Sequence, residues 1–160
     1  RYCYGFASWK SDILPGGFLK PYPDYADMEL LTPEQAKKEV KKYDHEGMVH
    51  TTWTMLTPFV YHICNCTVKD CTVLKAREEM GVKTLWKGEY MARINLEECN
   101  GCRDCMRMCN FGAIRYSLSM EKCDVNTLKC WGCGICRAEC RHEAITMVDR
   151  NTIPALANVW

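Results

Sequence analysis

The chain has 160 residues, of which 48% are apolar and 26% are charged, and its formal net charge is +1. This balance is typical of a globular protein and excludes disordered, collagen-like and coiled-coil chains, while the small net charge argues against a nucleic-acid-binding protein. The longest apolar stretch, at about residues 55–64, is interrupted by Pro58 and is shorter than the roughly 20 residues of a spanning helix. We therefore expect no membrane span and no signal-peptide core in these residues.

Cysteine is unusually frequent, with 13 in the chain, which indicates either a disulfide-linked scaffold or a metal protein. The number is odd, and eight of the cysteines fall in two tight runs, so complete pairing within the chain is impossible and metal binding is favoured. Thiols stay reduced in the cytoplasm. We therefore expect a cytoplasmic protein from an anaerobic setting.

Residues 1–31 are rich in aromatic residues, proline and glycine, as in the segments 14–17 (LPGG) and 22–25 (YPDY). They show neither helical nor strand periodicity, which predicts an extended arm. Exposing so many aromatic side chains to water is unfavourable, so we expect the arm to lie on a partner subunit or across its own domain. A poorly ordered terminus is the alternative.

The next region, residues 32–91, begins with a helix signal. Thr32 is suited to the N-cap, Pro33 takes the first helical position and Gln35 completes a capping box. Apolar residues then recur at helical spacing as far as Gly47, opposite a face of four lysines. That face is either solvated surface or a docking site for an acidic partner.

A third cysteine group, Cys64, Cys66 and Cys71, lies between a strand predicted over residues 51–56 and a helix predicted over residues 72–80. Three thiols within eight positions predict a further metal site, although the fourth ligand is not evident. The sequence leaves open a metal cluster, a zinc ion, or buried thiols that act as small apolar residues. The candidates for a fourth ligand are His62, His50, Cys3 and Cys123.

The region 92–150 contains a repeat. Cysteines spaced C-x2-C-x2-C-x3-C occur at 99–109 and again, 31 residues later, at 130–140, and the Ala-Ile pair at 113–114 recurs at 144–145. We expect this duplicated unit to fold with approximate two-fold symmetry. Loops of this length turn their thiolates inward around one compact inorganic cube, whereas structural zinc takes cysteine pairs separated by about a dozen or more residues.

On these two motifs the segment resembles the bacterial-type ferredoxin domain with two 4Fe-4S clusters. In that family the fourth cysteine of each run binds the other cluster, which ties the two halves together and supplies folding energy that a short core lacks. The ligand sets implied by the resemblance are Cys99, Cys102, Cys105 and Cys140 for one cluster and Cys109, Cys130, Cys133 and Cys136 for the other.

The chain departs from this family after each fourth cysteine, where Asn110 and Arg141 replace the usual proline. Both residues restore a backbone N–H, so we expect higher reduction potentials than in a proline-bearing relative. Cys123, between the motifs, is expected to be a free thiol near the surface. His142 is expected to be a hydrogen-bond donor near a cluster or an exposed side chain.

The resemblance implies an α+β fold, with a ferredoxin-like unit of short hairpins and two short helices. We expect a mixed, mainly helical extension to precede it and pack against it, and a tail, residues 151–160, to follow. The third cysteine group would then hold a third iron-sulfur cluster or zinc. The sequence shows no catalytic triad, P-loop, Rossmann fingerprint or metalloprotease motif, so no catalytic residue is expected.

Charge distinguishes a mobile carrier from a bound subunit. Residues 85–150 contain ten basic and nine acidic residues, which would steer a diffusing carrier only weakly. With the arm, this favours a small electron-transfer subunit of a larger anaerobic oxidoreductase, held by a catalytic redox partner. The alternatives are a standalone ferredoxin, a structural zinc protein, and a redox enzyme component or reductive activator in which the third cysteine group does chemistry.

Overall fold

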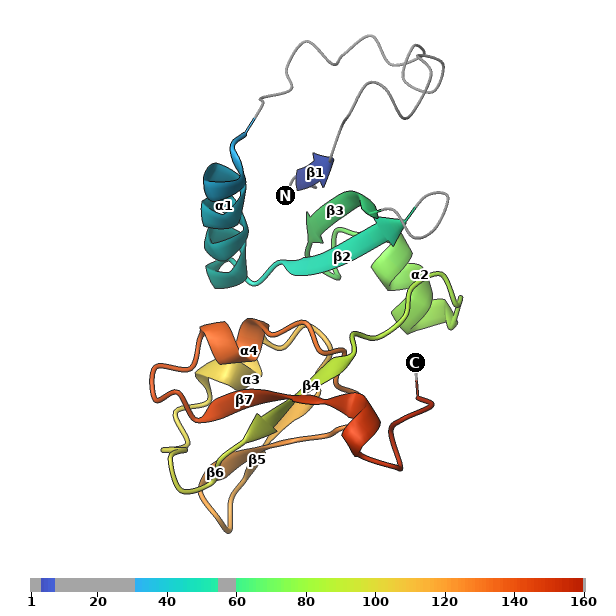
Figure 1. The fold of residues 1–160 in the computed structure, drawn as a ribbon. Helices are drawn as coiled ribbons and strands as arrows, with labels where there is room; N and C mark the ends of the chain where they lie inside the picture. The colour runs from blue at the N-terminus through green and yellow to red at the C-terminus, as the bar shows by residue number, and fades with distance from the viewer. Residues whose placement is uncertain (1–3, 8–30, 55–59, 160) are drawn as a thin grey trace, which may run out of the picture.

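The computed structural model of the chain describes residues 4–7, 31–54 and 60–159 (Figure 1). Most of the predicted arm, residues 8–30, lies outside the described residues, and so does Cys3. Within the described ranges, none of the helices combines the length and the apolar character that crossing a membrane requires.

The N-terminal half folds as one antiparallel sheet with two helices (Figure 1). The sheet has the strand order β1-β3-β2. Its elements and the two helices are β1 (Tyr4–Ala7), α1 (Pro33–His45), β2 (Val49–Thr54), β3 (Val60–Cys66) and α2 (Thr72–Met80). The strand predicted over 51–56 corresponds to β2, whereas β1 and β3 were not predicted.

Both helices begin and end where their sequences predict. The Thr32 hydroxyl accepts a hydrogen bond from the Gln35 backbone N–H at 3.3 Å, and the Gln35 side chain accepts one from the Thr32 N–H at 2.7 Å, which confirms the capping box. Helix α1 is followed by Gly47 at a φ of +74°, and α2 ends at Gly81 with a φ of +69°. Glycine carries little steric cost at such angles.

The C-terminal half is built from one repeated strand-helix-strand unit. Its elements are β4 (Tyr90–Ile94), α3 (Asp104–Met108), β5 (Ile114–Ser117), β6 (Lys122–Val125), α4 (Ile135–Ala138), β7 (Ile145–Asp149) and a short 3-10 helix (Arg150–Thr152). Strand β4 pairs with β7 and β5 with β6, both antiparallel, so each pair joins one strand from each half of the repeat. Together with the N-terminal half, this gives an α+β fold.

Two apolar clusters hold the molecule together. The first lies inside the repeat and includes cysteines from both motifs together with Leu156 from the tail. The second joins the two halves of the molecule, because Val49 and Leu74 of the N-terminal half pack with Phe111, Trp131 and neighbouring apolar residues of the repeat. In Figure 1, α3 and α4 lie on the side of the repeat that faces the N-terminal sheet.

Candidate functional site

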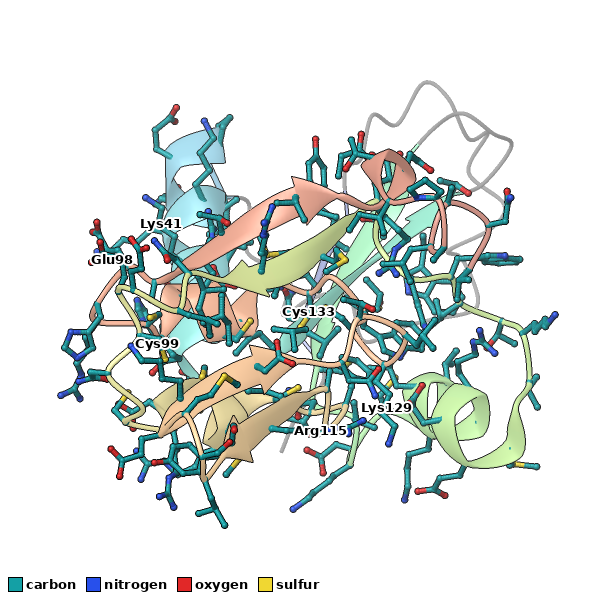
Figure 2. All side chains as sticks on the ribbon, turned by 90° about the horizontal axis from the view of Figure 1, so that it is seen from below. Lys41, Glu98, Cys99, Arg115, Lys129 and Cys133 are labelled. Carbon is teal, nitrogen blue, oxygen red and sulfur yellow. The ribbon has the colours of Figure 1, made fainter. Side chains whose placement is uncertain are left out.

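The repeat encloses two cavities, and each is lined by four motif cysteines. The first is lined by Cys99, Cys102, Cys105 and Cys140, and the second by Cys109, Cys130, Cys133 and Cys136. Figure 2 labels Cys99 of the first cavity and Cys133 of the second, which lie well apart.

The two cavities occupy equivalent places in the repeat. Each of the twelve residues that line the first cavity has its counterpart, 31 positions away in the sequence, in the lining of the second. Cys140 in the first cavity and Cys109 in the second come from the opposite half of the repeat. Each cavity therefore joins the two halves of the repeat, in the same cysteine combinations that the ferredoxin resemblance implies for its ligands.

Two equivalent glycines shape the loops that carry the cysteines. Gly101 and Gly132 have φ values of +74° and +78°, and a Cβ atom on them would collide with the backbone carbonyl oxygens of Glu121 and Tyr90, respectively. Any other residue would be strained at such a φ and would also force the strands away from the loops. Glycine at both positions lets the loops lie directly on the strands that precede the other motif.

Burial sets the acid-base state of the cavity thiols. It raises the pKa of Cys133 to about 11 and that of Cys136 to about 12, and it also raises the pKa of Cys105. Without metal these side chains are neutral thiols at neutral pH. A metal that binds them must displace their protons, so binding is linked to proton release.

Backbone N–H groups are directed at sulfur in the second cavity. The Ala113 N–H donates to Cys109 Sγ at 3.2 Å, and the Ala92 N–H donates to Cys130 Sγ at 3.5 Å. Such donors stabilise negative charge on sulfur and are typical of iron-sulfur sites. Four cysteines in the lining of each cavity, together with the backbone donors to sulfur in the second, therefore fit 4Fe-4S clusters.

Cationic side chains also support the cysteine loops. Lys122 Nζ donates to the carbonyl oxygen of Cys99 at 2.9 Å. Arg150 is fully buried, and its Nη2 donates to the carbonyl oxygen of Cys130 at 2.9 Å. These bonds fix the first cysteine of each motif and place a positive charge near each cavity.

The first cavity is the more polar of the two. The Cys102 backbone N–H donates to Asn100 Oδ1 at 3.1 Å, and Asn100 Nδ2 lies 2.8 Å from His142 Nε2, where it can donate a hydrogen bond. His142 is exposed, in agreement with the sequence analysis, and so is Cys102. The first cavity therefore lies near the surface.

The second cavity is covered by the N-terminal half. The rings of Phe111 and Trp131 stack with centroids 4.9 Å apart, and Trp131 Nε1 donates to Glu78 of α2 at 2.8 Å. Asn110, which stands where the ferredoxin family has proline, donates from Nδ2 to the carbonyl oxygen of Gly47 at 2.8 Å. The side chain of Asn110, directly after Cys109, thus connects the repeat to the loop after α1.

Cys123 is a free cysteine, as predicted, but the prediction that it lies near the surface was wrong. This residue lies in β6, is only 1% exposed and lines the first cavity as a fifth cysteine. The sequence carried a signal that was overlooked, because Cys123 precedes Cys130 by the same interval at which Ala92 precedes Cys99. Ala92 lines the second cavity at the equivalent position.

The third cysteine group lies outside the linings of the two cavities, in β3 and at the start of α2. Cys64 and Cys66 point to one side of β3, as alternate residues of a strand do. Cys71 occupies the N-cap position of α2 without a side-chain capping hydrogen bond, and it packs against the second apolar cluster. No group of three or more His, Cys, Asp or Glu side chains in residues 4–7, 31–54 and 60–159 is arranged to hold a single metal ion.

The candidates for a fourth ligand at this group have other environments. His50 contacts Asn65 through Nδ1 and Asp44 through Nε2, at 2.5 Å and 3.0 Å. Cys123 lines the first cavity, and Cys3 lies outside the described residues. His62 belongs to β3, where its backbone pairs with that of Trp53.

Comparison with known proteins agrees with this geometry. Residues 98–145 match the family model of the 4Fe-4S dicluster domain. The chain is also similar to the indolepyruvate oxidoreductase subunit IorA of Pyrococcus horikoshii, with 36% identity over 56 residues, and to the archaeal-type glutamate synthase (NADPH) of Thermotoga maritima, with 34% identity over 59 residues.

These matches cover 35% and 37% of this chain but only 9% and 12% of the two relatives, so the chain spans about a tenth of their length. Residues 98–145 therefore form a ferredoxin-type 4Fe-4S dicluster domain, which holds two 4Fe-4S clusters.

Proposed function

We propose that this chain is the small electron-transfer subunit of a larger oxidoreductase complex in an anaerobic cytoplasm, where it relays single electrons to or from a catalytic partner. A 4Fe-4S cluster, when bound, takes up and gives up one electron at a time. The observation that carries the proposal is the pair of cysteine-lined cavities at equivalent positions of the repeat. Two such sites within one small domain suit electron relay.

The proposed ligand sets follow the linings of the cavities: Cys99, Cys102, Cys105 and Cys140 hold one cluster, and Cys109, Cys130, Cys133 and Cys136 hold the other. Lys122 and Arg150 support the first cysteine of each motif through backbone carbonyl groups. Phe111 and Trp131 exclude water from the second cavity. Because Cys102 is exposed, a redox partner can approach the cluster of the first cavity more closely than that of the second.

The relatives support a place in a larger assembly. One is named as a subunit of an oxidoreductase and the other as a synthase that uses NADPH, and in both the matching segment is a minor part of a much longer protein. By analogy, we infer that this chain works beside a catalytic partner that supplies the substrate chemistry.

Gel filtration of the protein from its native source under anaerobic conditions tests this proposal. We expect the brown, iron-containing chain to elute with a second protein, well above its own mass of 18.5 kDa. A brown chain that elutes alone near its own mass is a standalone ferredoxin and contradicts the subunit proposal. Iron content near 12 per chain, instead of about 8, would favour a third cluster and the reductive-activator alternative.

A further inference from the structure

The linings of the two cavities differ in character although their positions are equivalent. Where the second cavity has apolar residues or glycine, the first has polar or charged ones at four positions, and at a fifth it has cysteine in place of alanine. The pairs, first cavity before second, are Asn100 and Trp131, Arg103 and Gly134, Asp104 and Ile135, His142 and Phe111, and Cys123 and Ala92. Only the last pair adds a further sulfur atom to a cavity.

Cys123 is built into the first cavity. It lies in the middle of β6, where its backbone pairs with Tyr116 of β5, and the strand holds it with 1% of its surface exposed. Its thiol is hydrogen-bonded to the thiol of Cys105, and the backbone of Arg103 also hydrogen-bonds to its sulfur. The sulfur atoms of Cys105 and Cys123 therefore lie side by side at the wall of the same cavity.

We propose that Cys123 is a reserve ligand of the first 4Fe-4S site, able to bind the iron that Cys105 binds when Cys105 is lost. The inference rests on the proposed ligand sets. On replacement, one Fe–S bond to Cys123 forms in place of the bond to Cys105, and the thiol proton of Cys123 passes to water. No oxidant or reductant is needed.

The second site has no such reserve, since Ala92 stands at the equivalent position. This asymmetry provides a control within one molecule. Cys136 is the counterpart of Cys105, so losing it leaves the second cavity with three sulfur ligands. Placing a cysteine at residue 92 would give the second cavity the same set of sulfur atoms as the first.

The test uses the full chain, prepared anaerobically, with iron, acid-labile sulfide and the electron paramagnetic resonance (EPR) spectrum of the reduced protein as readouts. We expect Cys105→Ala to keep the iron content of the unmodified chain and the spectrum of two 4Fe-4S clusters. The double variant Cys105→Ala/Cys123→Ala should lose half of the iron. Cys136→Ala should lose half by itself, and Ala92→Cys added to Cys136→Ala should restore it.

The proposal is overturned if Cys105→Ala loses as much iron as the double variant, or if it shows the signal of a 3Fe cluster in place of the first cube. If either Cys105 variant fails to fold, the second cavity provides the test. Equal iron loss in Cys136→Ala and in Ala92→Cys/Cys136→Ala would contradict the proposal. If the unmodified chain holds two clusters, the proposed clusters are present, and a contrary result in the variants then counts against the role of Cys123 alone. An unmodified chain without iron would refute both.

Discussion

At the scale of single residues, the loops around the clusters depend on glycines that no other residue can replace without strain. Gly101 and Gly132 combine a positive φ with a neighbouring carbonyl oxygen where a Cβ would lie. Gly112 also has a positive φ, of +58°, but no atom lies within 4 Å of its hypothetical Cβ. At the equivalent position of the second half, Glu143 adopts a φ of +50°. Comparing Gly112 with Gly101 and Gly132 therefore separates the free-energy cost of a positive φ from the cost of a steric collision.

We predict that Gly101→Ala and Gly132→Ala each lower the stability of the cluster-bound protein by more than about 2 kcal/mol. The left-handed backbone alone costs about 1–2 kcal/mol for a residue with a Cβ, and the collision with a backbone oxygen adds to it. Gly112→Ala should carry only the cost of the left-handed backbone, because no atom lies close to its Cβ position. The midpoint temperature for loss of cluster absorbance measures the effect, and equal losses in all three variants would contradict this account.

Sequence reasoning found the eight motif cysteines because cysteine spacing is a local property that survives without knowledge of the fold. It placed Cys123 wrongly because the interval before each motif becomes meaningful only when β4 and β6 are known to be equivalent strands. It also could not connect Asn110 with Gly47, because their contact depends on how the N-terminal half packs against the repeat.

At the scale of elements, the N-terminal half shows what periodicity can and cannot predict. The capping residues predicted α1, and Gly81 predicted the end of α2. Strand β3 was missed because its core position 65 holds asparagine, which breaks the expected apolar pattern. The structure explains this residue, since fully buried Asn65 contacts His50 across the paired strands β2 and β3. Buried polar groups of this kind require a partner, which the sequence does not reveal.

Attachment of the N-terminal half to the repeat depends in part on one side chain. We predict that Asn110→Ala destabilises this attachment by about 1–2 kcal/mol, because the buried carbonyl of Gly47 loses its donor. Hydrogen exchange of the backbone amides between α1 and β2 should then become faster. The exposed contact between His45 and Glu139 provides the control, since His45→Ala should change exchange by less than about 1 kcal/mol. A larger effect of His45→Ala would contradict this ranking.

At the scale of the whole molecule, cluster retention and pH are linked through the buried thiols. The pKa values of Cys133 and Cys136 are raised to about 11 and about 12, above the ordinary value of 9.0. In the metal-free fold these raised values contribute stability that is complete below about pH 9 and is lost as the pH rises through 11–12. Cluster binding has the opposite dependence, because protons compete with iron for the sulfur atoms.

We therefore predict that an iron chelator removes the clusters more readily at pH 6 than at pH 8.5. Each proton displaced by iron changes the cluster affinity by about tenfold per pH unit. Absorbance in the visible range under argon, followed over time at fixed chelator concentration, measures this. Cluster loss that is independent of pH, or faster at pH 8.5, would contradict the linkage between the thiol protons and iron.

The iron and sulfide content of the purified chain shows whether each of the two cavities of the repeat holds a 4Fe-4S cluster. Iron and acid-labile sulfide are determined per chain in an anaerobic preparation, together with the EPR spectrum after reduction. The account predicts about 8 iron and about 8 sulfide per chain, with a spectrum of two interacting clusters. A colourless chain that contains zinc, or no metal at all, would contradict it.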